Sequence, residues 1–160
     1  MSHSRARGEG SAKGKRIAII ASEVNPSVTR ALVRGATAVL RRRGASARHI
    51  RLLWVRGAFE LPVMAARLVK SRPRPHAIIA VGALIRGQTR QHEVIAHAVA
   101  QGLAQVAVSA TIPVTFGVIV ADTLAQAKAR AGGAMGNRGA EAALAALVVL
   151  DLFRRLSQNR

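Results

Sequence analysis

The stretch Ile17-Ala18-Ile19-Ile20-Ala21 is a short run of apolar residues without a polar side chain. A run of this length is typical of a strand buried on both faces of a parallel sheet, because successive side chains point to opposite faces. Asn25 and Pro26 follow, a pair that predicts a helix N-cap and the first helical residue. Apolar residues then recur at helical spacing as far as Gly44, so we expect one strand and one helix in residues 17–44.

The same alternation continues along the rest of the chain. We expect further strands at residues 50–55, 77–81 and 114–121. We expect further helices at about residues 60–70, 89–108, 122–131 and 139–156. Strands that alternate with helices predict a parallel sheet joined by right-handed crossovers. The expected fold is α/β, with three layers: a flavodoxin-like, parallel four-stranded sheet with helices on both faces, in a single domain.

Composition limits the compartment and the chemistry. The chain has 160 residues, 50% of them hydrophobic, which suits one core rather than two. It contains no cysteine, which excludes disulfides, thiolate zinc sites and a cysteine nucleophile, and makes the cytoplasm the expected location. Residues 1–15 are polar and basic, so we expect a disordered tail before a domain at 16–157. No apolar run reaches the ~20 residues that a bilayer requires, so no membrane partner is expected.

The net charge is strongly positive. There are 25 Lys and Arg residues against 7 Asp and Glu, a formal charge of +18. Such a field attracts phosphate-bearing ligands and polyanions, and nucleic acid is the first candidate among them. The aromatic residues that could stack on bases are few: Trp54, Phe59, Phe116 and Phe153. No zinc-finger, RNA-recognition or basic-zipper pattern is present, so an anionic cargo is an alternative interpretation and not the main one.

Residues 142–150 of the last expected helix are apolar on almost every side. A helix without a polar face is normally buried all round. A domain of this size can hardly cover such a helix alone, so we expect contacts with other subunits.

Ligands of parallel α/β sheets bind at the carboxyl ends of the strands. Three expected loops meet there: residues 22–25, 56–60 and 82–89. The third contains Arg86-Gly87-Gln88-Thr89 directly before a helix, where free backbone N–H groups and the helix dipole suit a phosphate. An equally good interpretation makes Thr89 the helix N-cap and Arg86 a solvated charge.

Two more polar side chains lie near these loops. His92 falls in the first turn of the helix, where the dipole favours a neutral imidazole that can accept a proton, although an exposed surface histidine fits the spacing as well. Glu60 lies beside a turn in Gly57-Ala58-Phe59-Glu60-Leu61-Pro62; alternatively Phe59 belongs to the core and Glu60 is a helix-start charge. His92 and His97 are five residues apart, whereas the helical zinc motif needs a spacing of four, so no metal site is expected.

Several stretches together carry a resemblance to a known family. They are Trp54-Val55-Arg56-Gly57-Ala58-Phe59-Glu60-Leu61-Pro62, Gly82-Ala83-Leu84-Ile85-Arg86-Gly87-Gln88-Thr89, Phe116-Gly117-Val118, Arg130-Ala131-Gly132 and Gly136-Asn137-Arg138-Gly139. In this order they resemble the lumazine synthase motifs W-V-P-G-A-F-E-I-P, G-T-V-I-R-G-x-T and F-G-V…R-A-G…G-N-K-G. The similarity runs without gaps from about Arg16 to Leu156.

The resemblance implies a reaction and a site. The reaction condenses 5-amino-6-(D-ribitylamino)uracil with 3,4-dihydroxy-2-butanone 4-phosphate to 6,7-dimethyl-8-ribityllumazine, releasing phosphate and water, without metal or organic cofactor. The implied phosphate-binding residues are Arg86, Gln88, Thr89 and Arg130. The implied residues for the other substrate are Val24, Ala58, Phe59, Glu60, Ala83, Leu84 and Ile85, with Phe116 from a neighbouring subunit. The implied assembly is a pentamer, a decamer or a 60-subunit icosahedral shell, with riboflavin synthase or an anionic cargo as candidate partners.

Four positions depart from the family pattern. Val24 stands where relatives have an aromatic residue that stacks on the substrate ring, which weakens binding. Gln91 stands at the position of the family's proton-transfer histidine, and a histidine comes one residue later, at His92. One residue along a helix is ~100° of rotation, so His92 need not face the same pocket. Arg56 replaces a proline, and Ala134 replaces a lysine found in many relatives.

These departures leave two hypotheses open. In the first, the chain is an active transferase, slower than its relatives, with His92 as the substitute for the residue at Gln91. In the second, it is a catalytically degenerate member that binds flavin or lumazine, or forms a cationic shell.

Overall fold

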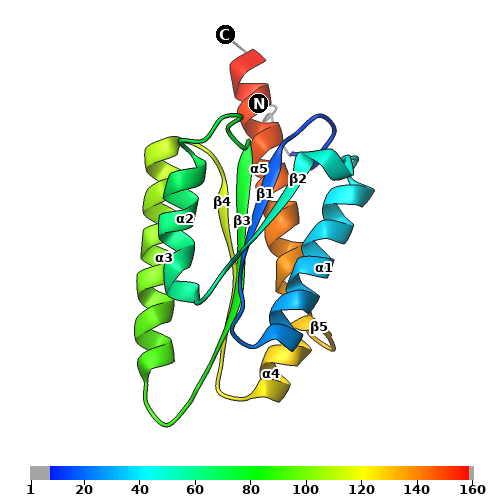
Figure 1. The fold of residues 1–160 in the computed structure, drawn as a ribbon. Coiled ribbons are helices and arrows are strands. Elements are labelled where there is room, and N and C mark those ends of the chain that lie inside the picture. The colour runs from blue at the N-terminus through cyan, green and yellow to red at the C-terminus, as the bar shows by residue number, and fades with distance from the viewer. Residues whose placement is uncertain (1–7, 159–160) are drawn as a thin grey trace, which may run out of the picture.

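A computed structural model describes residues 8–158 of the chain (Figure 1). Its sheet has four strands in the order β2-β1-β3-β4, and every neighbouring pair is parallel. The strands are β1 (Ile17–Ser22), β2 (Ile50–Val55), β3 (Ala77–Ile85) and β4 (Val114–Ala121). The expected parallel four-stranded α/β sheet is thus confirmed, and β3 is four residues longer than expected.

Two pairs of helices cover the two faces of the sheet. The pair α1 (Pro26–Arg42) and α5 (Arg138–Gln158) lies on one face, and the pair α2 (Leu61–Leu68) and α3 (Gln91–Ala110) lies on the other (Figure 1). The side chains of β1 alternate between these layers: Ile19 belongs to the core with α1 and α5, and Ile20 to the core with α2 and α3. This alternation explains the continuous apolar run, because both faces of the strand are buried.

Shorter elements shape the carboxyl end of the sheet. The expected helix at 60–70 is divided into a 3-10 turn, η2 (Ala58–Glu60), and α2. A second 3-10 turn, η1 (Ala47–His49), lies at the opposite, amino end of the sheet, directly before β2. The expected helix at 122–131 is only α4 (Leu124–Ala129), because the Thr123 hydroxyl accepts the Gln126 N–H at 3.2 Å and so caps its start. A hairpin of β5 (Ala131–Gly133) and β6 (Gly136–Asn137), which the sequence pattern did not predict, then leads into α5.

Residues 8–15 are packed against the domain, so the expectation of a disordered tail is wrong for this part of residues 1–15. The backbone N–H groups of Glu9, Gly10 and Ser11 donate to the Asp151 carboxylate of α5 at 3.0, 2.7 and 3.2 Å. Gly10 adopts a positive φ of 76°, which glycine accepts at little cost and which lets three successive N–H groups converge on one oxygen. The rest of the expected tail, residues 1–7, lies outside the described residues.

Helix α5 buries one face and exposes another. Leu144, Phe153 and Leu156 are 36%, 38% and 68% exposed in the single chain. The expected subunit contacts over this helix stay a prediction. None of the helices in residues 8–158 combines the length and apolar character needed to cross a membrane.

Candidate active site

The carboxyl end of the sheet brings three segments of the chain around one hollow of about 220 Å³. The loop after β1, the end of β3 and the start of α3 all contribute to it. Its lining residues, which define the histidine hollow, are Val24, Asn25, Ala83, Leu84, Ile85, Gly87, Thr89, Gln91, His92 and Ile95. Seven of the predicted site residues therefore meet here: Val24, Ala83, Leu84, Ile85, Thr89, Gln91 and His92.

Asn25 ties the loop after β1 to β3. It occupies the position before α1, but its side chain does not cap that helix as expected. Instead its Nδ2 donates to the Ala83 carbonyl at 2.9 Å, and its backbone is left-handed, with φ 54°. Asparagine tolerates this conformation better than most residues. The bond holds the neighbouring Val24, 46% exposed, beside the histidine hollow.

His92 is only 8% exposed, so the alternative of an exposed surface histidine is wrong. Its Nδ1 has no hydrogen-bond partner among the described residues. A buried polar atom without a partner costs about 1–3 kcal/mol, so the hollow is a place where a ligand or water restores a bond. His97 on the same helix is exposed, so the two histidines lie in different environments.

Helix α3 begins at Gln91, two residues later than expected. Thr89 is not its N-cap, although its Oγ1 accepts the Gln91 N–H at 3.4 Å. Gln91 and His92 both line the histidine hollow despite the rotation between successive helical residues, because they stand in the first, incomplete turn. His92 therefore lines the same hollow as Gln91, the position at which the family pattern has its histidine.

The predicted residues after β2 lie outside the histidine hollow. Ala58 is buried against α2 and α3, whereas Phe59 is 63% exposed, so the alternative that Phe59 belongs to the core is wrong. Glu60 Oε2 accepts the Gly57 N–H at 2.8 Å, and this bond fixes the turn. A second hollow, of about 450 Å³, lies next to this segment and is lined by Glu23, Pro26, Arg30, Trp54 and Arg56.

Arg56, which replaces the family's proline, forms an ion pair with Glu23 at 3.5 Å. Both side chains are largely exposed, so the pair adds little stability. The Glu23 N–H also donates to the Val55 carbonyl at 2.9 Å, and this bond holds the loop after β1 against the end of β2.

The predicted phosphate residues are spread over three elements. Arg86 follows β3, and its guanidinium lies 3.8 Å from the Asp122 carboxylate. Gln88 is exposed just before α3. Arg130 is the residue after α4 and does not line the histidine hollow. Phe116, 42% exposed on β4, does not line it either.

The two edges of the sheet thus carry separate parts of the predicted site. Trp54 lies on the edge strand β2, with Phe59 in the turn η2 that follows it, and Phe116 lies on the other edge strand, β4. Two edges of one sheet meet only when two copies of the chain lie side by side.

Sequence patterns alone missed two residues at the carboxyl end. Asn25 was predicted as a cap, and its bond to Ala83 spans 58 positions in the chain, beyond the reach of a local pattern. Ser22 was not singled out. Its Oγ is buried at the end of β1 and has no hydrogen-bond partner among the described residues. The sequence signal that could have identified Ser22 is a polar residue directly at the end of an apolar run.

Comparison with known proteins gives a single family. Residues 14–154 match the model of the 6,7-dimethyl-8-ribityllumazine synthase family. A protein of Gemmatimonas aurantiaca named 6,7-dimethyl-8-ribityllumazine synthase is 48% identical over 148 residues, covering 92% of this chain and 90% of that protein. Proteins of the same name from Halorhodospira halophila and Leuconostoc mesenteroides are 43% and 37% identical, covering 88% and 89% of this chain and 90% of each relative.

Proposed function

The chain belongs to the 6,7-dimethyl-8-ribityllumazine synthase family, and we propose that its histidine hollow carries out the lumazine-forming condensation with His92 as the proton-transfer residue. Membership makes the chain a transferase of riboflavin biosynthesis. The observation that carries the assignment of the site is the buried imidazole of His92, which lines one hollow together with Ala83, Ile85 and Thr89 of the family's G-T-V-I-R-G-x-T-like stretch.

The chemistry suits such a hollow. An amine of the pyrimidine attacks the ketone carbonyl, and water leaves as the C=N bond forms. Phosphate is then eliminated with loss of a proton from the neighbouring hydroxyl-bearing carbon, and the resulting enol becomes a ketone. The second amine attacks this ketone and closes the ring with loss of water. Holding two reactants in register provides a large part of the acceleration, and a positioned base adds about 10²–10⁴-fold. In the proposal Val24 and residues 83–85 contact the pyrimidine, and His92 moves protons between the amine and the departing oxygen.

The phosphate needs donors and positive charge. Backbone N–H groups before α3, with Gln88 and Thr89, supply donors at the positive end of the helix dipole. In the proposal Arg130 and Phe116 come from a second copy, because neither lines the histidine hollow of its own chain. The β2 edge of one subunit, with Phe59 and Glu60, then faces the β4 edge of the next.

We further propose a ring of subunits, with a pentamer as the unit and a decamer or 60-subunit shell as larger forms. The exposed apolar side chains of both sheet edges and of α5 support it: Leu52, Trp54, Phe116, Val120, Leu144 and Phe153. We place the enzyme in the cytoplasm, since the chain has no cysteine, with riboflavin synthase as a candidate partner. Mass photometry of the purified protein measures the subunit number, and a monomer at micromolar concentration would exclude the shared site.

The test of function is lumazine formation from both substrates, followed by absorbance and fluorescence and corrected for the spontaneous reaction. The rate should be proportional to protein, and His92→Ala should lower kcat by about 10²–10⁴-fold. His97→Ala is the matched control, an exposed histidine one turn further along α3, and should keep the rate.

The second function considered, a degenerate family member that binds flavin or lumazine without turnover, rests on Gln91 and Val24. The burial of His92 in the histidine hollow favours the active enzyme over it. Tight binding of a lumazine analogue together with no rate above background would reverse this preference.

A further inference from the structure

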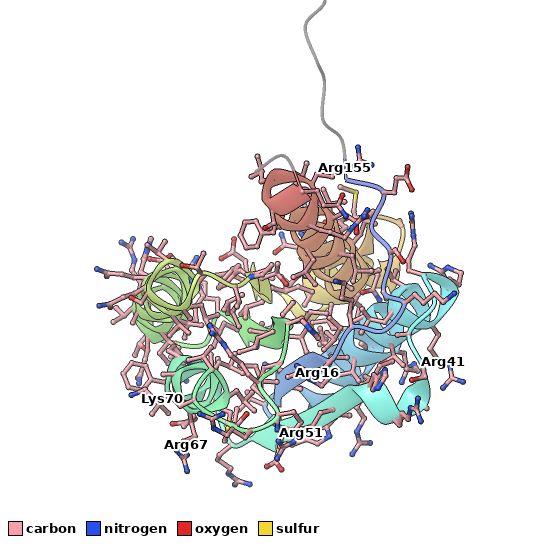
Figure 2. The ribbon with its side chains drawn as sticks, turned by 90° about the horizontal axis from the view of Figure 1, so that it is seen from above. Arg16, Arg41, Arg51, Arg67, Lys70 and Arg155 are labelled. Atoms are coloured by element: carbon pink, nitrogen blue, oxygen red, sulfur yellow. The ribbon has the colours of Figure 1, made fainter. Side chains whose placement is uncertain are left out.

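The acidic side chains of the chain gather at one end of the sheet. Five of the seven acidic residues lie at the carboxyl end: Glu23, Glu60, Glu93, Asp122 and Glu141. The amino end instead carries a crowd of exposed or half-exposed basic residues, several of which Figure 2 shows from above. We call this set the basic face: Lys13, Lys15, Arg16, Arg41, Arg42, Arg48, Arg51, Arg67, Lys70, Arg72 and Arg74.

No carboxylate of the described chain neutralises the basic face. The ion pairs within residues 8–158 join Glu23 to Arg56, Asp122 to Arg86, Glu141 to Arg138 and Glu9 to Arg155. Asp151, the other acidic residue near this end, is buried and accepts three backbone N–H groups. The positive charge of the basic face is therefore left for an external anion.

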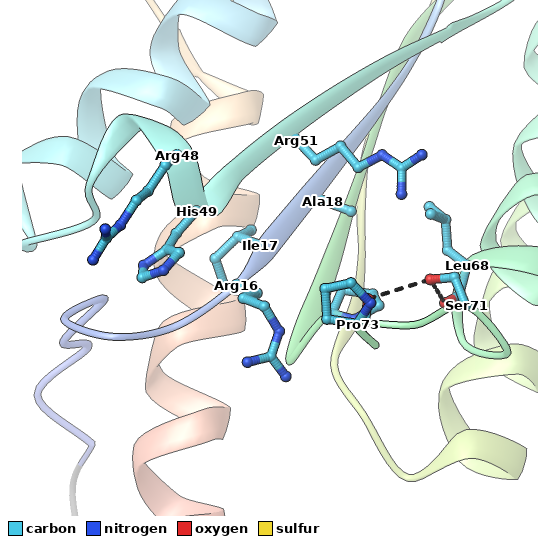
Figure 3. A pocket seen from close by; sticks show the side chains of 10 residues that line it. Arg16, Ile17, Ala18, Arg48, His49, Arg51, Leu68, Ser71 and Pro73 are labelled. Carbon is cyan, nitrogen blue, oxygen red and sulfur yellow. Dashed lines mark hydrogen bonds between the residues drawn. The ribbon is translucent and has the colours of Figure 1, made fainter.

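A hollow of about 110 Å³ lies within the basic face (Figure 3). Arg16, Arg48 and Arg51 surround it, together with His49 and Ser71. Arg16 is held in place, since its Nε donates to the Arg74 carbonyl at 3.0 Å and its backbone N–H donates to His76 Nδ1 at 2.8 Å. Its volume of about 110 Å³ is enough for one phosphate group beside the three guanidinium groups.

The positive charges at this end also act on His76. Its pKa is lowered by burial first, and then by the positive charges of Arg16, Lys15 and His49. Neighbouring positive charges disfavour one more proton, as expected where positive charge is not compensated.

The layout of the charges indicates a chain of phosphates rather than a single anion. Arg41 of α1, Arg51 of β2 and Arg67 of α2 come from three elements and spread across the view in Figure 2. Most members are arginines, whose planar guanidinium fits a phosphate with two parallel bonds. The exposed aromatic residues, Trp54, Phe59, Phe116 and Phe153, are not part of the basic face, so no stacking platform for bases lies within it.

We propose that the basic face binds the phosphodiester backbone of a nucleic acid, without reading its sequence, at the end of the sheet opposite the histidine hollow. Because contacts to backbone phosphates carry no base information, RNA and DNA of any sequence should bind with similar affinity. This binding is independent of the proposed catalysis, and the two sites can be occupied together.

The test uses the full-length protein and a fluorescein-labelled 30-nucleotide single-stranded RNA of random sequence, with binding followed by anisotropy between 50 and 300 mM salt. The test variant combines Arg48→Gln, Arg51→Gln and Arg67→Gln, three exposed members of the basic face. The matched control combines Arg30→Gln, Arg34→Gln and Lys128→Gln, which removes the same charge from exposed residues elsewhere. Circular dichroism and mass photometry verify that both variants fold and assemble as the parent does.

We expect the test variant to bind RNA at least about 10-fold more weakly near 0.1 M salt and to reduce the slope of log K against log salt by about 2, whereas the control changes affinity by less than about threefold. A single-stranded DNA of the same length should give the same pattern. Equal losses in both variants would overturn the proposal in favour of diffuse net charge. The proposal would also be overturned if the parent protein did not bind RNA at 50 mM salt, or if it bound inorganic polyphosphate but not RNA.

Discussion

The carboxyl and amino ends of the same sheet differ in how far their buried polar groups are hydrogen-bonded within the fold. At the carboxyl end Ser22 Oγ and His92 Nδ1 are buried without a partner, and Asn25 holds a left-handed backbone. At the amino end the buried Asp151 carboxylate accepts three N–H groups, and His76 Nδ1 accepts the Arg16 N–H. Within residues 8–158 one further buried oxygen has no partner, Thr115 Oγ1 near the amino end of the edge strand β4, and it is the exception to this division.

This difference indicates that polar groups at the amino end stabilise the fold, whereas those at the carboxyl end are available to a ligand. Polar groups satisfied within the fold stabilise it, whereas polar groups left unpaired cost free energy until a ligand bonds to them. Substitutions at the amino end should therefore change unfolding more than turnover, and substitutions at the carboxyl end should do the reverse. The predictions below test this division.

The largest effect is expected for Asp151→Ala at the amino end. The substitution leaves the N–H groups of Glu9, Gly10 and Ser11 without an acceptor, which costs about 2–3 kcal/mol of unfolding free energy. The unfolding midpoint should fall by roughly 5–10 °C, as measured by circular dichroism, while lumazine formation at 25 °C stays at the parent rate.

Glu141→Ala is the control for this prediction. Glu141 lies on the same helix but is exposed and paired with Arg138, so its removal should cost less than about 1 kcal/mol. Although burial alone would raise the pKa of Asp151, the N–H groups of Ser11, Gly10 and Glu9 lower it overall. Its contribution is therefore complete above the usual value of 3.8 and is lost as the pH falls through the lower folded pKa. A parent and a variant with equal midpoints at pH 7 would contradict the interpretation.

Arg130→Ala should act at the carboxyl end on substrate affinity and leave the unfolding midpoint unchanged. Loss of a charge-assisted bond to phosphate costs about 1.5–3 kcal/mol, so KM for the phosphorylated substrate should rise roughly 10–100-fold. Lys128→Ala, an exposed cation on the adjacent helix α4, is the matched control and should change KM little.

The shared site makes a sharper version possible. Arg130→Ala subunits, which are slow at low substrate concentration, and His92→Ala subunits, which have a low kcat, should regain part of the parent activity when co-expressed and assayed at low substrate concentration, because some interfaces then pair an intact His92 with an intact Arg130. Failure of this complementation in verified mixed assemblies would mean that both residues act within one chain.

Local sequence patterns predicted the helices and strands well, but they did not predict hydrogen bonds between residues that are far apart in the chain. The strands at residues 50–55 and 114–121 match the structure at both ends, because continuous apolar runs bounded by polar turns are local signals. The anchoring of residues 8–15 depends on Asp151, about 140 positions away, so nothing in the tail itself predicted it. The β5–β6 hairpin has no apolar alternation to mark it.

The candidate site shows the same limit. The family motifs singled out the residues that line the histidine hollow, but spacing alone left the direction of His92 open. The point where α3 begins decides that direction, since His92 then shares the buried face of the helix with Ala96 and Val99, and a helix start is uncertain by one or two residues in any sequence pattern.

A smaller effect is expected for Val24→Phe. Val24 is 46% exposed beside the histidine hollow, so a larger side chain can be added without displacing the core. A ring that stacks on the pyrimidine should contribute about 0.5–1.5 kcal/mol, which lowers its KM roughly 2–10-fold. Val24→Leu adds apolar volume without an aromatic face and is the control. Equal gains in both variants would mean that volume rather than stacking limits binding.

The smallest effect concerns the pH dependence of stability at the amino end. Because the pKa of His76 is lowered in the fold, by burial and by Arg16, Lys15 and His49, the unfolded chain binds this proton more readily than the folded chain. Stability should therefore fall as the pH drops below about 6.5, the usual value, and through the lower folded pKa. His76→Asn keeps an acceptor for the Arg16 N–H without titrating, so its unfolding midpoint should fall less than the parent's between pH 7.5 and 5.

His97→Asn is the control for this prediction, since His97 is exposed on α3 and far from the basic face in the fold. Salt separates the two causes of the shift. Added salt screens the charges of Arg16 and Lys15 but leaves burial unchanged, so the difference between parent and His76→Asn should shrink in 1 M salt without vanishing. A difference that salt does not alter would mean that burial alone sets the shift, and the amino end would then lose His76 as a reporter of its uncompensated charge.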